Sequence, residues 1–234
     1  MEHPQRQPHV ARRLVWDLPL RLFHWSLVLL LAASWLTAEL ERMTLHFYAG
    51  YGVATLLVFR LAWGFIGPRY ARFGSFLAGP RRVFAYLRDW LNGEAREPAG
   101  HTPPGGWMIL ALLSLIALQV ASGMLNSHDG LDAGPWYWAA SEDLRDLAED
   151  VHEAGFDLLL VLAAVHIVAV LLYLLRPGIN LVGAMFSGRK RTGEPAIRGS
   201  RLPLALALLA AAAAGVWYLV SAAPPPSMAD LGLY

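Results

Sequence analysis

Two histidines, His152 and His166, lie 14 residues apart in a largely apolar stretch that ends at Leu175. On an α-helix this spacing returns to within about 40° of the same face and separates the two imidazoles by about 21 Å along the axis. Ionisable side chains deep in an apolar helix are rare and usually functional. Imidazole is a common metal ligand, so we expect the rest of the chain to supply partners for these two rings.

Five apolar segments are long enough to cross a lipid bilayer, at residues 22–40, 47–66, 107–125, 156–175 and 202–223. Each has 19 to 22 residues, and about 20 suffice for a hydrocarbon layer of about 30 Å. With 56% hydrophobic and only 16% charged residues, the composition excludes an ordinary soluble domain. We therefore predict an all-α integral membrane protein with five transmembrane helices.

Charge is distributed unevenly between the connecting segments. Residues 1–21, 67–106 and 176–201 carry net charges of +2, +3 and +5, whereas residues 127–153 hold eight acidic residues against one arginine. Basic segments stay in the cytoplasm, so the N-terminus is expected inside and the C-terminus outside. The acidic loop would then face the periplasm or the exterior. The lipid bilayer is an expected partner and nucleic acid is not.

Four histidines within or beside these spans sort into two levels. His46 opens the second span on the outer side, and His152 precedes the fourth span on that same side. His24 and His166 remain, both displaced towards the cytoplasm, at depths of about 3 Å and 13 Å from the inner helix ends. The outer pair is well matched in depth, whereas the inner pair rests on elimination.

Two histidine pairs stacked across a membrane suit two haems, each with an imidazole on either side of its ring. The chain has no cysteine, which excludes covalent haem attachment, iron–sulfur clusters and thiolate metal sites. The haems would therefore be b-type and held non-covalently. Both axial positions of each iron would be filled, which favours electron transfer over oxygen binding. The predicted iron ligands are His24, His46, His152 and His166.

A haem-free membrane protein, either a histidine-containing metal transporter or a structural anchor, is the alternative from another functional class. A transport site predicts histidines clustered at one depth with carboxylates nearby. Here the histidines fall at two levels, and Asp157, near the outer edge of its span, is the only mid-span carboxylate.

Two arginines are candidates for contacts with a cofactor. Arg60 lies 14 residues after His46 on the same helix face, towards the cytoplasmic end. A buried guanidinium there favours an anion such as a haem propionate, and the alternative is an arginine that extends to the lipid headgroups. Arg21, at the cytoplasmic start of the first span, is counted with the cofactor-binding residues. Its alternative is a place in the interfacial belt beside Trp25.

Small and polar residues near the histidines are expected to shape the site. Gly50 follows His46 by four residues and would leave room for a flat macrocycle, whereas Gly50 and Gly52 could instead allow close helix packing. The third span has neither charge nor histidine and should supply packing. Its Gln119, Ser122 and Gly123 are expected to contact a cofactor or a neighbouring helix.

Two cytoplasmic features lie between the second and third spans. Pro80–Leu91 has an apolar stripe flanked by arginines, a pattern typical of an interfacial helix. His101 precedes a proline- and glycine-rich turn, and we expect a loop histidine there, with a position near a quinone site as the alternative.

At this point the sequence resembles the bacterial cytochrome b561 family, which includes the b-type cytochrome subunits of nickel–iron hydrogenases. The resemblance covers about residues 14–191 and rests on short motifs that are specific in combination. The matching stretches are Val15-Trp16-Asp17, Arg21-Leu22-Phe23-His24-Trp25, His46 with Gly50, Arg60-Leu61-Ala62-Trp63-Gly64-Phe65-Ile66-Gly67, Tyr70-Ala71-Arg72-Phe73, Gly105-Gly106-Trp107, His152-Glu153, His166, and Asn180-Leu181 with Gly188-Arg189-Lys190.

The resemblance implies a four-helix transmembrane bundle over residues 14–191 with two b haems, ligated at His24, His46, His152 and His166. It also implies electron exchange between the quinone pool and a redox partner in the bacterial inner membrane. The chain would be an electron-transfer protein, a quinone-linked oxidoreductase subunit, or the membrane anchor of a hydrogenase-like complex. Residues 1–13 would form a cytoplasmic tail. Residues 192–234, with the fifth span, lie outside the familiar pattern and suggest an added anchor or partner-facing helix.

The acidic outer loop suggests a docking surface. Ser141 is placed to cap a short acidic helix that leads into His152, with Glu142 and Asp143 in its first turn. Negative charge above the outer haem would attract a basic redox partner, for which a periplasmic c-type cytochrome is expected. The alternatives are another redox subunit or a merely solvated face, and homo-oligomer formation stays open.

Overall fold

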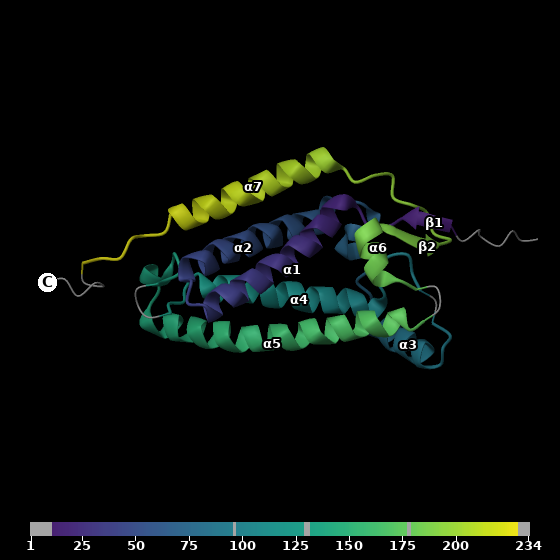
Figure 1. The fold of residues 1–234 in the computed structure, drawn as a ribbon, viewed down its shortest axis with the longest axis horizontal. Helices are drawn as coiled ribbons and strands as arrows, with labels where there is room; N and C mark the ends of the chain where they lie inside the picture. The colour runs from purple at the N-terminus through teal and green to yellow at the C-terminus, as the bar shows by residue number, and fades with distance from the viewer. Residues whose placement is uncertain (1–10, 96, 129–131, 177–178, 229–234) are drawn as a thin grey trace, which may run out of the picture.

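The computed structural model describes residues 11–95, 97–128, 132–176 and 179–228. Its five long helices are α1 (Leu18–Glu39), α2 (Met43–Ile66), α4 (Pro103–Gly123), α5 (Glu142–Leu174) and α7 (Leu202–Ser221). All five are long and apolar enough to cross a membrane, as the sequence predicts. They extend along the long axis of the molecule (Figure 1).

Three of these helices begin four residues before the apolar segments that predict them, because capping residues precede the hydrocarbon-crossing part. Asp17 accepts a hydrogen bond from the Leu20 N–H at the start of α1, and Thr102 accepts one from the Gly105 N–H at the start of α4. Both helices have proline in the first turn, where no backbone donor is lost. Hydropathy marks the span, but the caps set the helix end.

The helices pack mainly as two hairpins. A short turn over residues 40–42 joins α1 to the antiparallel α2, and α4 packs against α5. Contacts between α2 and α4 bring the hairpins together, while α7 lies along α2 (Figure 1, yellow). The described core lies between these helices and includes Val53, Leu57 and Trp63 of α2 with Leu113 and Ile116 of α4.

The helix α5 is a single continuous element from Glu142 to Leu174. The sequence predicts a short acidic helix followed by a span, but no proline interrupts the two parts. Ser141 occupies the N-cap position without a side-chain hydrogen bond, and Glu142 and Asp143 lie in the first turn as expected. His152 is consequently an interior residue of a rigid helix.

A two-stranded antiparallel ribbon lies at the end of the molecule that carries Arg189 and Lys190, where no strand is expected. The strand β1 (Ala11–Leu14) pairs with β2 (Arg189–Thr192), with Leu14 opposite Arg189. Residues 11–13 therefore belong to a strand and are no free tail, while residues 1–10 lie outside the described part. Gly188, at a φ of 75°, ends the short helix α6 (Leu181–Ser187) and accepts hydrogen bonds from the backbone of residues 15 and 16. We call β1, β2 and α6 the inner cap.

The amphipathic helix α3 spans Pro80–Leu91, the bounds that the sequence predicts. The Tyr86 hydroxyl lies 2.9 Å from the Tyr173 hydroxyl, and Arg176 donates to the Trp90 carbonyl at 2.7 Å. These contacts attach α3 to the end of α5. Phe84 and Leu91 on α3 are exposed, as expected for a helix at a membrane interface. Single turns of 3-10 helix complete the described fold at Arg69–Ala71, Phe73–Ser75 and Tyr137–Ala139.

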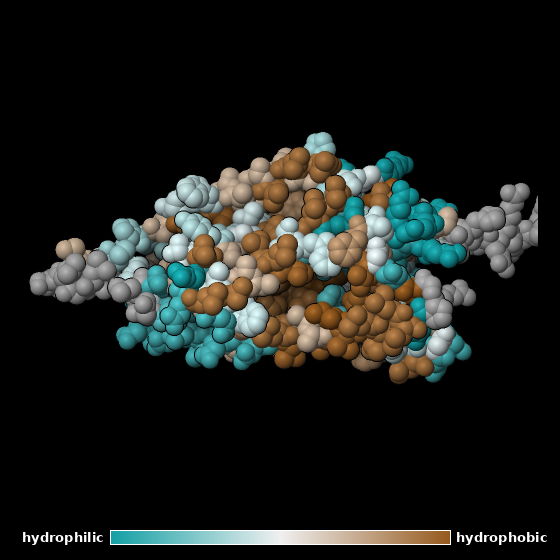
Figure 2. Space-filling view, in the orientation of Figure 1, coloured by the Kyte–Doolittle hydropathy of each residue, from teal (hydrophilic) through white to brown (hydrophobic). Residues whose placement is uncertain are grey.

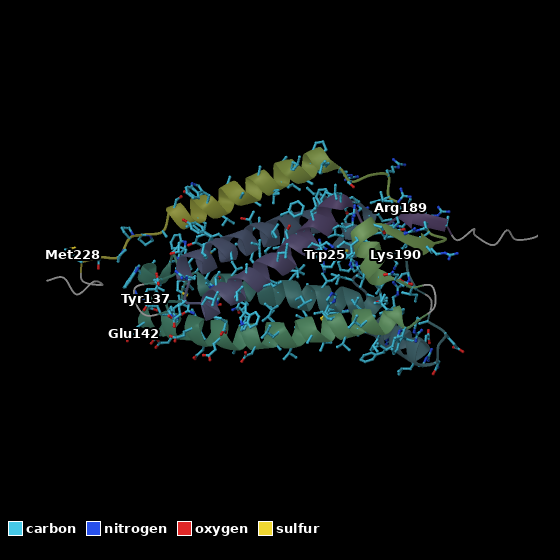
Figure 3. The ribbon with its side chains drawn as sticks, viewed as in Figure 1. Trp25, Tyr137, Glu142, Arg189, Lys190 and Met228 are labelled. Carbon is cyan, nitrogen blue, oxygen red and sulfur yellow. The ribbon has the colours of Figure 1, made fainter. Side chains whose placement is uncertain are left out.

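The surface separates into an apolar middle and two polar ends. Hydrophobic side chains cover much of the central region, and hydrophilic ones gather at both ends (Figure 2). Tyr137 and Glu142 lie at one end, and Arg189 and Lys190 at the other (Figure 3). Large apolar side chains are exposed on all five long helices. This arrangement is that of a multi-pass membrane protein.

Candidate functional site

The two outer histidines face each other from different helices. The rings of His46 on α2 and His152 on α5 have centroids 6.2 Å apart, and their planes cross at 76°. His46 Nδ1 lies 2.9 Å from the Ser34 carbonyl oxygen on α1. His152 Nδ1 lies 3.1 Å from the Gln119 carbonyl oxygen and 3.1 Å from the Ser122 hydroxyl on α4. A ring that donates from Nδ1 keeps Nε2 as the metal-binding nitrogen.

The helix α4 positions His152 through two further residues. Gln119 donates from Nε2 to the His152 carbonyl at 2.8 Å. A Cβ at Gly123 would lie only 2.8 Å from His152 Cε1. Glycine at this position therefore leaves room for the imidazole to pack against α4. Both residues were expected to contact a cofactor or a neighbour. Ser34 was not expected, because a serine in an apolar helix gives no sign of which ring it will meet.

The inner histidines are His24 on α1 and His166 on α5. His24 Nδ1 is buried and has no hydrogen-bond partner in the described part of the chain. The neighbouring Trp25 packs at right angles to His24, with ring centroids 4.9 Å apart, and stacks on Phe186 of the inner cap at 4.5 Å. The inner pair thus lies beneath the inner cap but lacks the hydrogen-bond support of the outer pair.

Arg60 is enclosed within the protein and does not extend to the headgroup region. Its side chain is 2% exposed, its guanidinium lies 4.7 Å from the Phe73 ring centroid, and its Nη1 has no described partner. The carboxylate whose negative charge acts on Arg60 is that of Asp17. Asp17 is fully buried and accepts from Leu20 N and, at 3.1 Å, from Trp63 Nε1. Burial raises the pKa of Asp17 above its ordinary value.

Arg21 connects α1 to the inner cap. Its Nη1 donates to the Phe186 carbonyl, and its Nε is buried without a described partner. A Cβ at Gly188 would lie 3.2 Å from that Nε. The cap contact accounts for one guanidinium nitrogen, and a role of Arg21 in cofactor binding stays a prediction.

The two glycines after His46 differ in their surroundings. A Cβ at Gly50 would meet no atom within 4 Å, whereas a Cβ at Gly52 would lie 2.9 Å from a Leu30 methyl group. The expectation of open space therefore holds for Gly50, and the expectation of close helix packing holds for Gly52. Open space beside Gly50 lies one helical turn from His46.

His101 lies in the loop before α4, as the sequence predicts, but its ring packs between aromatic side chains. Its ring lies between Trp16 and Phe76, at centroid distances of 4.5 Å and 4.6 Å. Its Nδ1 is buried and has no described partner. Burial, assisted by the nearby positive charge of Arg60, lowers the pKa of His101 to about 3. Phe76 also packs against Phe73, which lies under the Arg60 guanidinium, so His101 borders the surroundings of Arg60.

The outer pair fits a metal held between two imidazoles. A metal–imidazole bond is about 2 Å long, so two rings on opposite sides of one metal have their centroids about 6 Å apart. The measured 6.2 Å agrees, and the space beside Gly50 is available for a macrocycle. A transporter site would need a larger group of ligands, and no cluster of three His, Cys, Asp or Glu side chains suited to a metal occurs among the described residues.

Comparison with known proteins gives a family match and one relative. Residues 15–188 match the family described as prokaryotic cytochrome b561. The probable Ni/Fe-hydrogenase B-type cytochrome subunit of Rhizobium leguminosarum bv. viciae is 22% identical over 218 residues, covering 75% of this chain and 87% of that subunit. No solved structure matches significantly. The family match includes all four histidines described above and ends before α7.

Proposed function

This chain belongs to the prokaryotic cytochrome b561 family and is a membrane b-type cytochrome of electron transport. We propose that it binds two b haems and transfers electrons between a quinone and a redox partner protein. His46 and His152 would hold the outer haem, and His24 and His166 the inner one. A bis-histidine haem supplies reversible one-electron transfer without an open coordination position.

The geometry of the outer pair carries the proposal. Two imidazoles from different helices lie 6.2 Å apart, and each Nδ1 has an acceptor within 3.1 Å. Such contacts fix the ring orientation and increase the basicity of Nε2. A neutral ring that donates from Nδ1 keeps an unprotonated Nε2, and a metal between the two rings would bind both of these nitrogens.

The remaining residues of the chain would orient the cofactors and exclude water. The helices α1 and α5 place the inner histidines beneath the inner cap, and the apolar core between the levels keeps the electron path dry. Gly50 would leave room for the outer haem. Arg60 would place a positive charge near a propionate of the inner haem. Arg21 would hold the inner cap over that site through its bond to Phe186.

We assign the haem-binding bundle to α1, α2, α4 and α5, within residues 14–191, and treat α7 as an addition. His24, His46, His152 and His166 lie on those four helices, as do the hydrogen-bond partners of His46 and His152. The basic segments support an orientation in the bacterial inner membrane with the N-terminus cytoplasmic and the C-terminus periplasmic. The acidic start of α5 would then face a periplasmic c-type cytochrome.

A place as the membrane subunit of a hydrogenase-like complex is the second candidate. The observation that favours it is the relative whose name describes a hydrogenase cytochrome subunit. In that case the redox partner would be another subunit and not a diffusing cytochrome. Purification in mild detergent distinguishes the two, because a stable subunit would co-purify in stoichiometric amount.

The visible spectrum and haem content of the purified protein test the proposal. We expect reduced b-type α-bands, two non-covalent haems per chain, and oxidation or reduction by a soluble quinone analogue. Haem-replete cells that yield protein without α-bands would refute the cytochrome assignment. One haem per chain would refute the two-site arrangement while leaving a b-type cytochrome.

A further inference from the structure

The loop that carries His101 is held firmly against the inner cap. Lys190 of β2 pairs with Glu97 at 2.5 Å and donates to the Pro98 carbonyl at 3.1 Å. The Ala99 N–H donates to the Glu194 carboxylate at 3.2 Å. These contacts span about 90 residues of sequence, so the position of His101 is set by the folded cap and not by its own turn.

Several buried nitrogens without partners gather at this cytoplasmic end. They belong to Arg13, Arg21, His24, Trp25, Arg60 and His101. Buried donors without acceptors are rare in native proteins and indicate a missing ligand or water. The outer pair differs, since both of its Nδ1 atoms have acceptors. Asp17 Oδ2 is also buried without a described partner at this end, so the unpartnered nitrogens outnumber the unpartnered carboxylate groups there.

We propose that His101 and Arg60 jointly receive one carboxylate of the inner haem, with His101 donating from Nδ1. The inference rests on the proposed function, because it needs a haem between His24 and His166. Arg60 and His101 border one aromatic cluster, because Arg60 lies over Phe73, His101 packs on Phe76, and these two phenyl rings have centroids 5.8 Å apart. Trp16 and Phe76 hold its ring from two sides. A neutral imidazole protonated at Nδ1 has one N–H to give.

The charges nearby favour an anion over a neutral acceptor such as a quinone carbonyl. Arg60 is buried and forms no ion pair with Asp17 in the described part of the chain. Lys190 is already engaged by Glu97. An enclosed guanidinium without an ion pair is costly, and a carboxylate would satisfy it and His101 together.

Redox titration of the whole protein, following each haem by its spectrum, tests the role of His101. His101→Leu should lower the equilibrium constant for reduction of the inner haem about tenfold. For one electron this is a fall of about 59 mV in its midpoint potential. The carboxylate would lose a donor, so its negative charge would oppose reduction more strongly. Its pKa would rise, and the inner potential should become more dependent on pH. His101→Asn keeps a donor and should restore most of both properties.

Matched variants separate this role from general damage. Exposed His128→Leu should leave both potentials unchanged. Arg60→Leu should also lower the potential of the inner haem. The potential change in the double variant should be smaller than the sum of the two single changes, because both residues bind one carboxylate. Two haems with an unaltered inner potential in His101→Leu would overturn the inference and leave the proposed function standing. So would an unaltered potential with a raised KM for a quinol, which would assign His101 to quinone. Absence of haem in the unmodified protein would refute the proposed function itself.

Discussion

At the scale of single residues, the two histidine pairs differ in what supports them. His152 is held by Gln119 and Ser122, and His46 by Ser34, whereas His24 has a buried Nδ1 without a described partner. Donation from Nδ1 strengthens an imidazole ligand. We therefore expect the outer site to bind its haem more tightly than the inner site.

We expect His46→Ala and His152→Ala each to remove the same outer haem, while His24→Ala and His166→Ala remove the inner one. Haem content should fall from two to one per chain in every case, because a haem with one axial histidine binds weakly in the absence of a covalent link. Haem assays and low-temperature spectra of each variant measure this. If His46 and His152 variants lost different haems, the pairing by level would be wrong.

Gly50 offers a test of where the macrocycle lies. Leucine at Gly50 should reduce outer haem content strongly, since its side chain would fill the space that the structure leaves open. Gly215→Leu is the matched control, because Gly215 also has open surroundings but lies on α7. Equal haem content in both variants would mean that the outer haem does not reach Gly50.

At the scale of elements, the hairpins and α7 contribute differently. The helices α4 and α5 together carry His152 and its partners, so their packing sets the site. By contrast, α7 meets α2 through small buried residues, Ala205, Ala212 and Val216. Small side chains bury little apolar area, so α7 should add little to the stability of the bundle.

Removal of α7 by ending the chain after residue 201 should leave both haems bound. We expect the thermal midpoint to fall by only a few degrees, about 2–4 °C for each kcal/mol lost in a protein of this size. Spectra and thermal unfolding of the truncated protein in detergent measure the two effects. Loss of either haem would show that α7 belongs to the haem-binding unit.

At the scale of the whole molecule, opposite charge marks the two ends. Acidic residues on the first turns of α5 are exposed at the outer end, whereas arginines and Lys190 of the inner cap lie at the other (Figure 3). Under the proposed function, this asymmetry would orient the protein in the membrane and would favour a basic partner at the acidic end.

Neutralising the acidic start of α5 should slow electron exchange with a basic periplasmic cytochrome by about tenfold at low salt. The change replaces Glu142, Asp143, Asp146 and Asp150 with their amides. Both haems should be retained, and the dependence of the rate on salt should flatten. Stopped-flow kinetics over a range of ionic strength measure it. If the rate depended neither on salt nor on these substitutions with every basic cytochrome tested, the acidic surface would have no role in docking.

The sequence by itself determined the five membrane-spanning helices, the bounds of α3, and the common level of His46 and His152. Each depends on local periodicity, hydropathy and capping, which a short segment carries within itself. The Ser34–His46 contact, the ribbon of β1 with β2, the different roles of Gly50 and Gly52, and the enclosure of His101 were decided only by the tertiary structure. They depend on how helices rotate and on contacts across many residues, because a side chain's neighbours on another helix leave no trace in its own segment.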